Sequence, residues 1–103
     1  MDLKVSWSKS AIEQLETIFD YYKNKANERI AKEIVKRIVD KTLLLETQPR
    51  IGPQEELLRS RKFEYRYLLE GNYKIIYWVD EPFIKIATVF DCRRNPGIIA
   101  EIK

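Results

Sequence analysis

Two adjacent arginines, Arg93 and Arg94, follow the last apolar segment of the chain in "VFDCRRNP", residues 89–96. Two further cations, Arg66 and Lys74, stand within apolar segments upstream. Arginine presents a planar fork of hydrogen-bond donors and lysine a compact charge, so both side chains suit phosphate and carboxylate groups. If the fold brings these four residues together, they repel one another unless an anion lies among them. We therefore treat them as a candidate anion-binding set.

Local pairing is the simpler alternative for each of these cations. Arg93 could pair with Asp91 or Glu101, and Lys74 with an acid on a neighbouring strand. Charges on an exposed sheet face are common and need no ligand. The two interpretations differ in whether the cations converge, which depends on the fold.

The chain lacks most of the side chains that carry out acid–base chemistry. It contains no histidine and one cysteine, Cys92, so the commonest general base and metal ligand are missing and no internal disulfide can form. Its three glycines stand too far apart for a phosphate-binding loop. RNA can be cleaved by attack of its own 2′-hydroxyl on the adjacent phosphate. In this chain, the base for that step would have to be a lysine, a carboxylate or a tyrosinate. The candidate set could stabilise charge, but arginine gives up a proton poorly. We expect no cofactor and no metal.

Length and charge indicate one domain, residues 1–103, with a basic second half. The net charge is +3. Residues 1–56 are balanced, with ten Lys/Arg and ten Asp/Glu, whereas residues 57–94 hold eight Lys/Arg against five Asp/Glu. A local basic face suits nucleic acid or an acidic protein segment. No apolar run is long enough for a membrane span, and the first residues lack a signal-peptide pattern, so we expect a cytoplasmic protein.

The first half predicts a strand followed by two helices. "LKVSW" alternates between apolar and polar residues, which is typical of a short strand over residues 3–7. Apolar residues recur at helical spacing over residues 9–25, and again from a cap at Asn27 to Thr47. Residues 48–62 carry two prolines and a glycine and read as a connecting loop.

The second half predicts three strands, at residues 63–69, 73–79 and 83–91. A three-residue turn would pair Leu69 with Tyr73. The element order β-α-α-β-β-β predicts an α+β fold, with the helix hairpin packed on one face of a twisted antiparallel sheet.

The expected register decides where the cations point. It places Arg66 and Lys74 together on the sheet face opposite the helices, which would be partly open. Trp78 shares the alternation of Lys74, so it could stack on a nucleic-acid base. Lys85 projects from the next strand toward that face, and Arg93 follows at the exit of that strand.

Several segments, taken in order, resemble the RelE/ParE superfamily of type II toxin–antitoxin toxins. They are "WSKSAIEQLETIFDYY", "RIAKEIVKRIVDKTLLL", "QPRIGPQEEL", "YRYLLEGNYKIIYWV" and "IKIATVFDCRRNP". The resemblance spans residues 3–98 and implies a helix hairpin on a twisted antiparallel sheet. It also implies a hetero-oligomer with a cognate antitoxin whose C-terminal segment wraps the toxin.

Two branches of that superfamily imply different functions. ParE-like members poison DNA gyrase by binding, and the "TQPRIGPQEEL" loop and long helices resemble that branch. RelE-like members bind the ribosome and cut messenger RNA, and Arg66, Lys74 and Arg93 match their basic catalytic positions. Leu68 replaces a common lysine, and no tyrosine follows Tyr77. We expect a ParE-like gyrase inhibitor, with a RelE-like endoribonuclease as the alternative and a toxin that only binds its antitoxin as a third. We expect the cations and the aromatic residue of this face to bind the target or the antitoxin: Arg66, Lys74, Trp78, Lys85, Arg93 and Arg94. Only if the protein is a ribonuclease would Arg66, Lys74 and Arg93 be catalytic.

Overall fold

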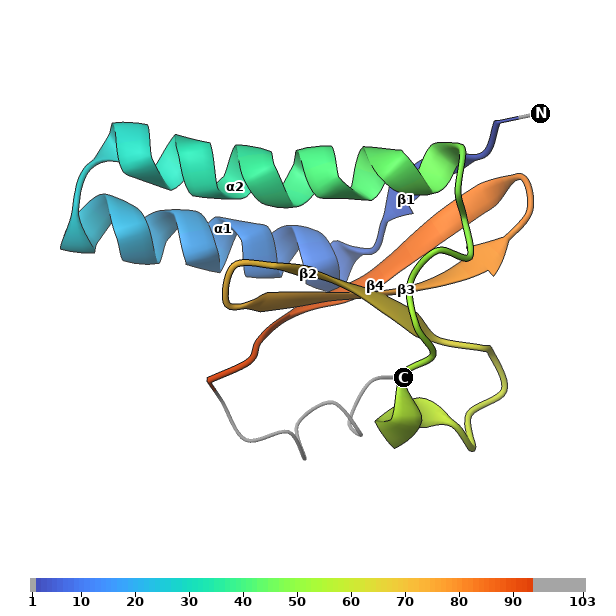
Figure 1. Cartoon of the computed structure of the whole chain (residues 1–103). Helices are drawn as coiled ribbons and strands as arrows, with labels where there is room; N and C mark the ends of the chain where they lie inside the picture. The colour runs from blue at the N-terminus through green and yellow to red at the C-terminus, as the bar shows by residue number, and fades with distance from the viewer. Residues whose placement is uncertain (1, 94–103) are drawn as a thin grey trace.

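The computed structural model describes residues 2–93 and shows a helix hairpin lying across a twisted sheet (Figure 1). The elements are, in order, β1 (Lys4–Trp7), α1 (Lys9–Lys25), α2 (Glu28–Leu43), the 3-10 turns η1 (Leu44–Glu46) and η2 (Glu56–Leu58), β2 (Arg66–Glu70), β3 (Tyr73–Asp80) and β4 (Phe83–Asp91). The predicted α+β class and element order are confirmed.

Both helices begin where a side chain can satisfy a free backbone donor. The Ser8 side chain accepts a hydrogen bond from the Ala11 N–H at 3.0 Å, and Asn27 accepts from the Ile30 N–H at 2.9 Å. Such caps stabilise a helix N-terminus by about 1 kcal/mol each. The caps fix where α1 and α2 begin, and burial of the apolar stripes, which include Ile18 of α1 and Ile38 of α2, turns both helices toward the core.

The sheet is mixed, with the strand order β1-β4-β3-β2. Strands β2, β3 and β4 pair antiparallel, as expected, but β1 pairs parallel to β4, with Val5 opposite Ile84. The expectation of a wholly antiparallel sheet is therefore wrong for β1. Both helices and two strands lie between β1 and β4 in the chain. The two strands are therefore not joined by a tight turn, and they can pair in parallel.

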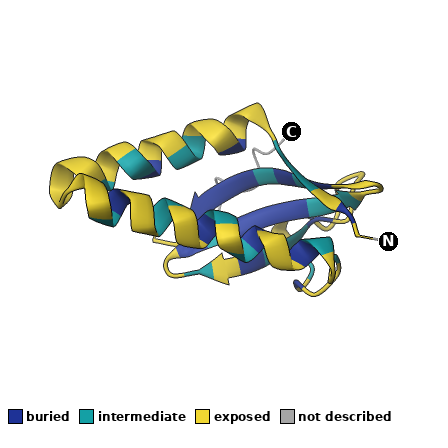
Figure 2. Ribbon diagram, turned by 90° about the horizontal axis from the view of Figure 1, so that it is seen from above, coloured by how far each residue is buried: buried dark blue, intermediate teal, exposed yellow. Residues whose placement is uncertain are grey.

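The main core lies between the helices and the sheet (Figure 2). Ile38 of α2 and Leu45 of η1 have no exposed surface, and neither have Ile75, Tyr77 and other residues of the central strands. Val5, Leu15 and Ile34 are among the partly buried residues at its edge.

The predicted pairing of Leu69 with Tyr73 is wrong by one residue. Glu70 pairs with Tyr73, and a two-residue turn at Gly71 and Asn72 joins the strands. Gly71 takes a positive φ of 57°, which glycine adopts without strain at the first position of such a turn. A slip of one residue exchanges the two faces of a strand. Leu68 therefore joins the core under the helices, and the odd-numbered residues of β2 face the other way.

The second face of the sheet is covered, against the expectation of a partly open face. Residues 49–65, here called the strap, cross this face below the sheet in Figure 1. Leu58 and Tyr65 of the strap form a second buried cluster with Ile76 and Phe90 of the sheet. The strap is also tied to the edge of β2, because the Tyr67 N–H donates to the Pro53 carbonyl at 3.0 Å.

Candidate functional site

Arg66 is held at the start of β2 by the strap. Its Nη1 donates to the Gly52 carbonyl at 2.8 Å, and its Nη2 lies 2.9 Å from a carboxylate oxygen of Glu64. Arg66 pairs in register with Tyr77 and shares the helix-side alternation of Leu68. Its side chain is 22% exposed. The guanidinium thus fastens the strap to the sheet.

Gly52 and Tyr77, which the sequence did not single out, complete this attachment. The Gly52 N–H donates to the phenol oxygen of Tyr77 at 3.0 Å. A Cβ atom at Gly52 would lie 2.3 Å from the Tyr67 carbonyl oxygen, so the strap can approach this closely only with glycine here. Burial raises the pKa of Tyr77, so its hydroxyl stays protonated and remains a hydrogen-bond partner rather than a base.

Lys74 lies on the other face of the sheet, under the strap. Its Nζ is 2.9 Å from a carboxylate oxygen of Glu55 and 4.3 Å from the centre of the Tyr67 ring. The Glu55 side chain is 4% exposed and that of Lys74 is 21% exposed. The strand slip explains this placement, because it separates Lys74 from Arg66. The expectation that these two cations share one face is wrong.

Trp78 of β3 and Lys85 of β4 are paired in the sheet, and each contacts a phenylalanine ring. The Trp78 ring stacks on Phe63 of the strap, with centroids 3.8 Å apart and planes inclined by 11°. The Nζ of Lys85 lies 4.8 Å from the centre of the Phe83 ring. Trp78 is thus already stacked on a protein ring.

Arg93 is bound by Asp91, as the local-pairing alternative predicts. Arg93 Nε and Nη2 donate to the two carboxylate oxygens of Asp91 at 3.0 and 2.8 Å. These hydrogen bonds, and then the charge of Asp91, raise the pKa of Arg93 above its ordinary value, so it remains a cation. Arg94 and Glu101 lie outside the described residues.

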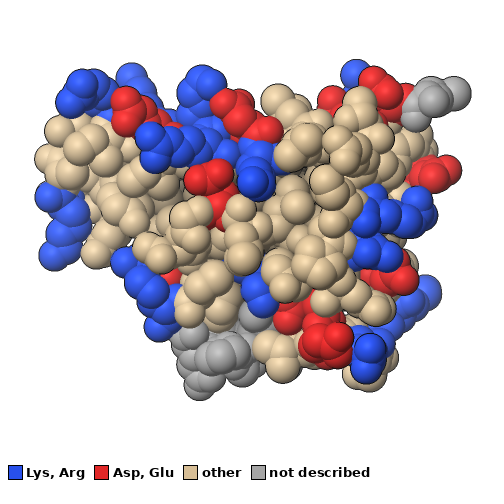
Figure 3. Space-filling model, in the orientation of Figure 1, with Lys and Arg blue, Asp and Glu red and all other residues tan. Residues whose placement is uncertain are grey.

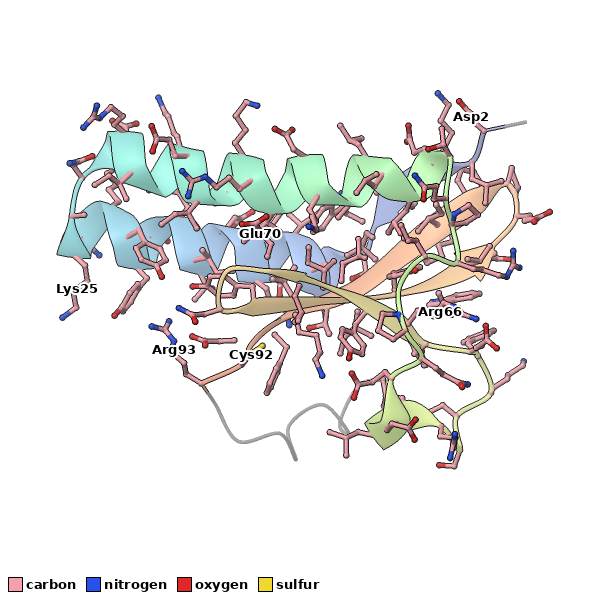
Figure 4. All side chains as sticks on the ribbon, in the orientation of Figure 1. Asp2, Lys25, Arg66, Glu70, Cys92 and Arg93 are labelled. Atoms are coloured by element: carbon pink, nitrogen blue, oxygen red, sulfur yellow. The ribbon has the colours of Figure 1, made fainter. Side chains whose placement is uncertain are left out.

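Three of the four candidate cations can be placed, and they do not converge. Figure 4 shows Arg66 and Arg93 at opposite ends of the sheet. Within residues 2–93, no group of three or more acidic, cysteine or histidine side chains could hold a metal ion. No helix of this part of the chain is long and apolar enough to cross a membrane.

The fold and sequence place the chain in a known family. A sequence profile described as ParE toxin of the type II toxin–antitoxin system parDE matches residues 5–96. The chain belongs to this family. As a ParE-family toxin it is one component of a type II toxin–antitoxin system, which supports a cognate antitoxin as its partner.

Solved structures share the fold of this ParE-family toxin. The chromosomal ParDE system of P. aeruginosa matches with a TM-score of 0.73 and 21% identity, over 86% of this chain and 95% of that chain. The RelBE2 toxin–antitoxin complex of Mycobacterium tuberculosis matches with a TM-score of 0.55 and 18% identity, over 88% of this chain and 99% of that chain. The YoeB dimer of Staphylococcus aureus matches with a TM-score of 0.57 and 21% identity, over 85% of this chain and 94% of that chain. A search of curated proteins found no match. The predicted superfamily is confirmed.

Proposed function

We propose that this toxin acts by binding and inhibiting DNA gyrase, and that its cognate antitoxin neutralises it. The family match and the dispersal of the cations support this proposal. Arg66 is bound to Gly52 and Glu64, and Lys74 to Glu55 on the opposite face of the sheet. A ribonuclease that stabilises a charged phosphorane would need such cations around one phosphate. A toxin that acts by binding alone does not.

Proton transfer is the second requirement that the described residues meet poorly. Tyr73 and Tyr77 both have a raised pKa, because burial disfavours the charged tyrosinate, so neither is a ready base at neutral pH. Asp91 already accepts three hydrogen bonds from Arg93. A RelE-like endoribonuclease using Arg66, Lys74 and Arg93 remains the alternative, but it would have to release these contacts before acting.

Two assays on the purified toxin separate these functions. In a gyrase supercoiling assay we expect inhibition or trapped cleaved DNA, reversed by adding the cognate antitoxin. In a translating extract we expect no cleavage of messenger RNA in the ribosomal A site. Unaffected supercoiling at excess toxin would refute gyrase inhibition. Cleavage that Arg93→Ala abolishes would establish the ribonuclease.

A further inference from the structure

Three aromatic rings and two lysines gather where the strap meets the β3–β4 end of the sheet. The Trp78 ring of β3 lies against Phe63 of the strap, with ring centroids 3.8 Å apart. Lys85 pairs with Trp78 in the antiparallel register, which places the two side chains on the same face of the sheet. Lys62 precedes Phe63 in the strap, and Phe83 stands two residues before Lys85 in β4. These five residues are here called the aromatic–lysine patch.

Phe63 presents an aromatic ring to solvent. One face of this ring is covered by Trp78, whose plane is inclined to it by 11°. The ring of Tyr65 meets it in an edge arrangement, with centroids 6.4 Å apart. Phe63 nevertheless keeps 37% of its surface exposed, so part of the ring remains free to meet another flat group. A planar group bound there would extend the stack that Phe63 and Trp78 begin.

The two lysines of the patch form no ion pair with any other residue from 2 to 93. The Lys62 Nζ lies 5.6 Å from the centre of the Phe63 ring, and the Lys85 Nζ lies 4.8 Å from the centre of the Phe83 ring. Such contacts are weak at exposed sites, so either ammonium group can turn toward an anion. The three candidate cations placed above differ in this respect, because each is already held by a carboxylate.

The strap beside the patch carries an excess of positive charge. Residues 56–62 hold three cations and one acid, Glu56, which lies 3.5 Å from Arg59. On the other side of Phe63, Glu64 is bound to Arg66 at 2.9 Å. Figure 3 shows cationic groups along the right-hand side of the molecule, where the strap runs below the sheet. The surroundings of the patch therefore favour an anionic ligand.

We propose that the aromatic–lysine patch binds single-stranded DNA, with a base stacked on Phe63 and phosphates contacting Lys62 and Lys85. Cations beside an open aromatic ring suit single strands, whose bases are free to stack. An acidic protein segment would use the lysines but would not need the open ring. The choice of DNA over RNA rests on the proposed function, because gyrase acts on DNA. The strand would approach from the strap side, since Asp80 and Glu81 of the β3–β4 turn are exposed acids.

The test measures binding of the purified toxin to a labelled oligothymidylate of about 12 nucleotides, a length within the site sizes of single-strand-binding folds. Fluorescence anisotropy at low salt gives the affinity, which should fall as salt is added. An abasic oligonucleotide of the same length keeps the phosphates but lacks the bases. It should bind about fivefold or more weakly, because it cannot stack on Phe63.

The ring is tested by Phe63→Leu, which removes the aromatic surface but keeps an apolar side chain against Trp78. This variant should bind oligothymidylate about fivefold or more weakly and should no longer prefer it to the abasic strand. Tyr21→Leu is the matched control, because it removes an exposed ring from α1, and it should leave both affinities unchanged. Circular dichroism and thermal unfolding check that both variants keep the fold.

The phosphate contacts are tested by the double variant Lys62→Gln/Lys85→Gln. Each phosphate contact with a single strand contributes about 0.7 to the slope of the logarithm of the binding constant against that of the salt concentration. The slope should therefore become shallower by about 1.4. The double variant Lys9→Gln/Lys23→Gln is the control, since it removes the same charge from exposed positions of α1 and should keep the wild-type slope.

Several results would overturn the proposal. They are an absence of binding to oligothymidylate, equal binding of oligothymidylate and the abasic strand, and equal salt slopes for the two lysine variants. Tighter binding of an RNA oligouridylate of the same length would overturn the assignment to DNA. If the wild type binds oligothymidylate as expected but leaves supercoiling unaffected, only the gyrase proposal fails. If it inhibits gyrase but does not bind the strand, only the present inference fails.

Discussion

The phenol oxygen of Tyr77, buried at the centre of the sheet, accepts a hydrogen bond from the backbone N–H of Gly52 at 3.0 Å. Tyr77→Phe would remove this acceptor and leave the Gly52 N–H buried without a partner. An orphaned buried donor costs about 1–3 kcal/mol. We expect the free energy of unfolding, measured by urea denaturation, to fall by about that amount. Tyr21→Phe, which removes an exposed hydroxyl, should change it little. Equal stability of the two variants would show that this bond is not needed to hold the strap.

Gly52→Ala tests the close approach of the strap to β2. The added Cβ would lie 2.3 Å from the Tyr67 carbonyl oxygen and 2.8 Å from the Tyr77 hydroxyl oxygen. The strap must then move outward, and overpacking of this kind costs roughly 1–3 kcal/mol. Hydrogen exchange should show faster opening of the Tyr67 amide, which bonds to Pro53 in the strap. Unchanged protection of that amide would contradict this account.

Glu55 and Lys74 form an ion pair that is buried on the acid side. Removing either partner leaves a charge under the strap, and we expect Glu55→Gln or Lys74→Met to cost roughly 2–3 kcal/mol. This cost is smaller than the ~3–5 kcal/mol typical of fully buried pairs, because Lys74 keeps part of its side chain in water. The double variant should recover part of the loss, which a double-mutant cycle by urea unfolding would measure. The exposed pair Lys36–Asp40 is the control, with an expected coupling of about 0.3–0.5 kcal/mol.

Tyr73 should make stability fall at alkaline pH. Burial, and then its hydrogen bond with the Tyr22 hydroxyl, raise the pKa of Tyr73 in the folded chain. The unfolded chain releases this proton near pH 10, whereas the folded chain retains it. The stability that the neutral phenol contributes is therefore complete below about pH 10 and is lost as pH rises above that value.

The Tyr73 prediction is checked by urea unfolding on both sides of this pH. The free energy of unfolding of the wild type should decrease more steeply above about pH 10 than that of Tyr73→Phe. Tyr21→Phe serves as the control and should follow the wild type. Parallel curves for wild type and Tyr73→Phe would show that Tyr73 ionises equally in both states.

The helices and the cap at Asn27 could be predicted from the sequence because each rests on local signals. The pairing of β2 could not, because both alternating sets of this strand contain large apolar residues and a two- or three-residue turn fits the "EGN" segment. Residues 75–79 contain a continuous apolar run, and such a run is typical of a strand buried on both faces. That run was the available signal that the strap covers the second face.

The candidate site was predicted less well than the fold, because Arg66 and Lys74 are bound by groups of the strap, whose path the sequence did not reveal. Asp91 stands two residues from Arg93, so local pairing could be foreseen. Glu55 is 19 residues from Lys74 and meets it only through the path of the strap. Arg66 binds backbone carbonyls, which no pattern of side chains reveals. The stacking of Phe63 on Trp78 also left no motif, since it depends on the path of the strap.

The position of β4 between β1 and β3 has a consequence for synthesis of this toxin. The strand made last among the described elements is central, and the first strand has no sheet partner until it arrives. A nascent chain that has not yet emerged as far as Asp91 therefore cannot close its sheet, whatever its helices have done. The first strand to be made, β1, is therefore the strand that waits longest for its partner, because only β4 pairs with it.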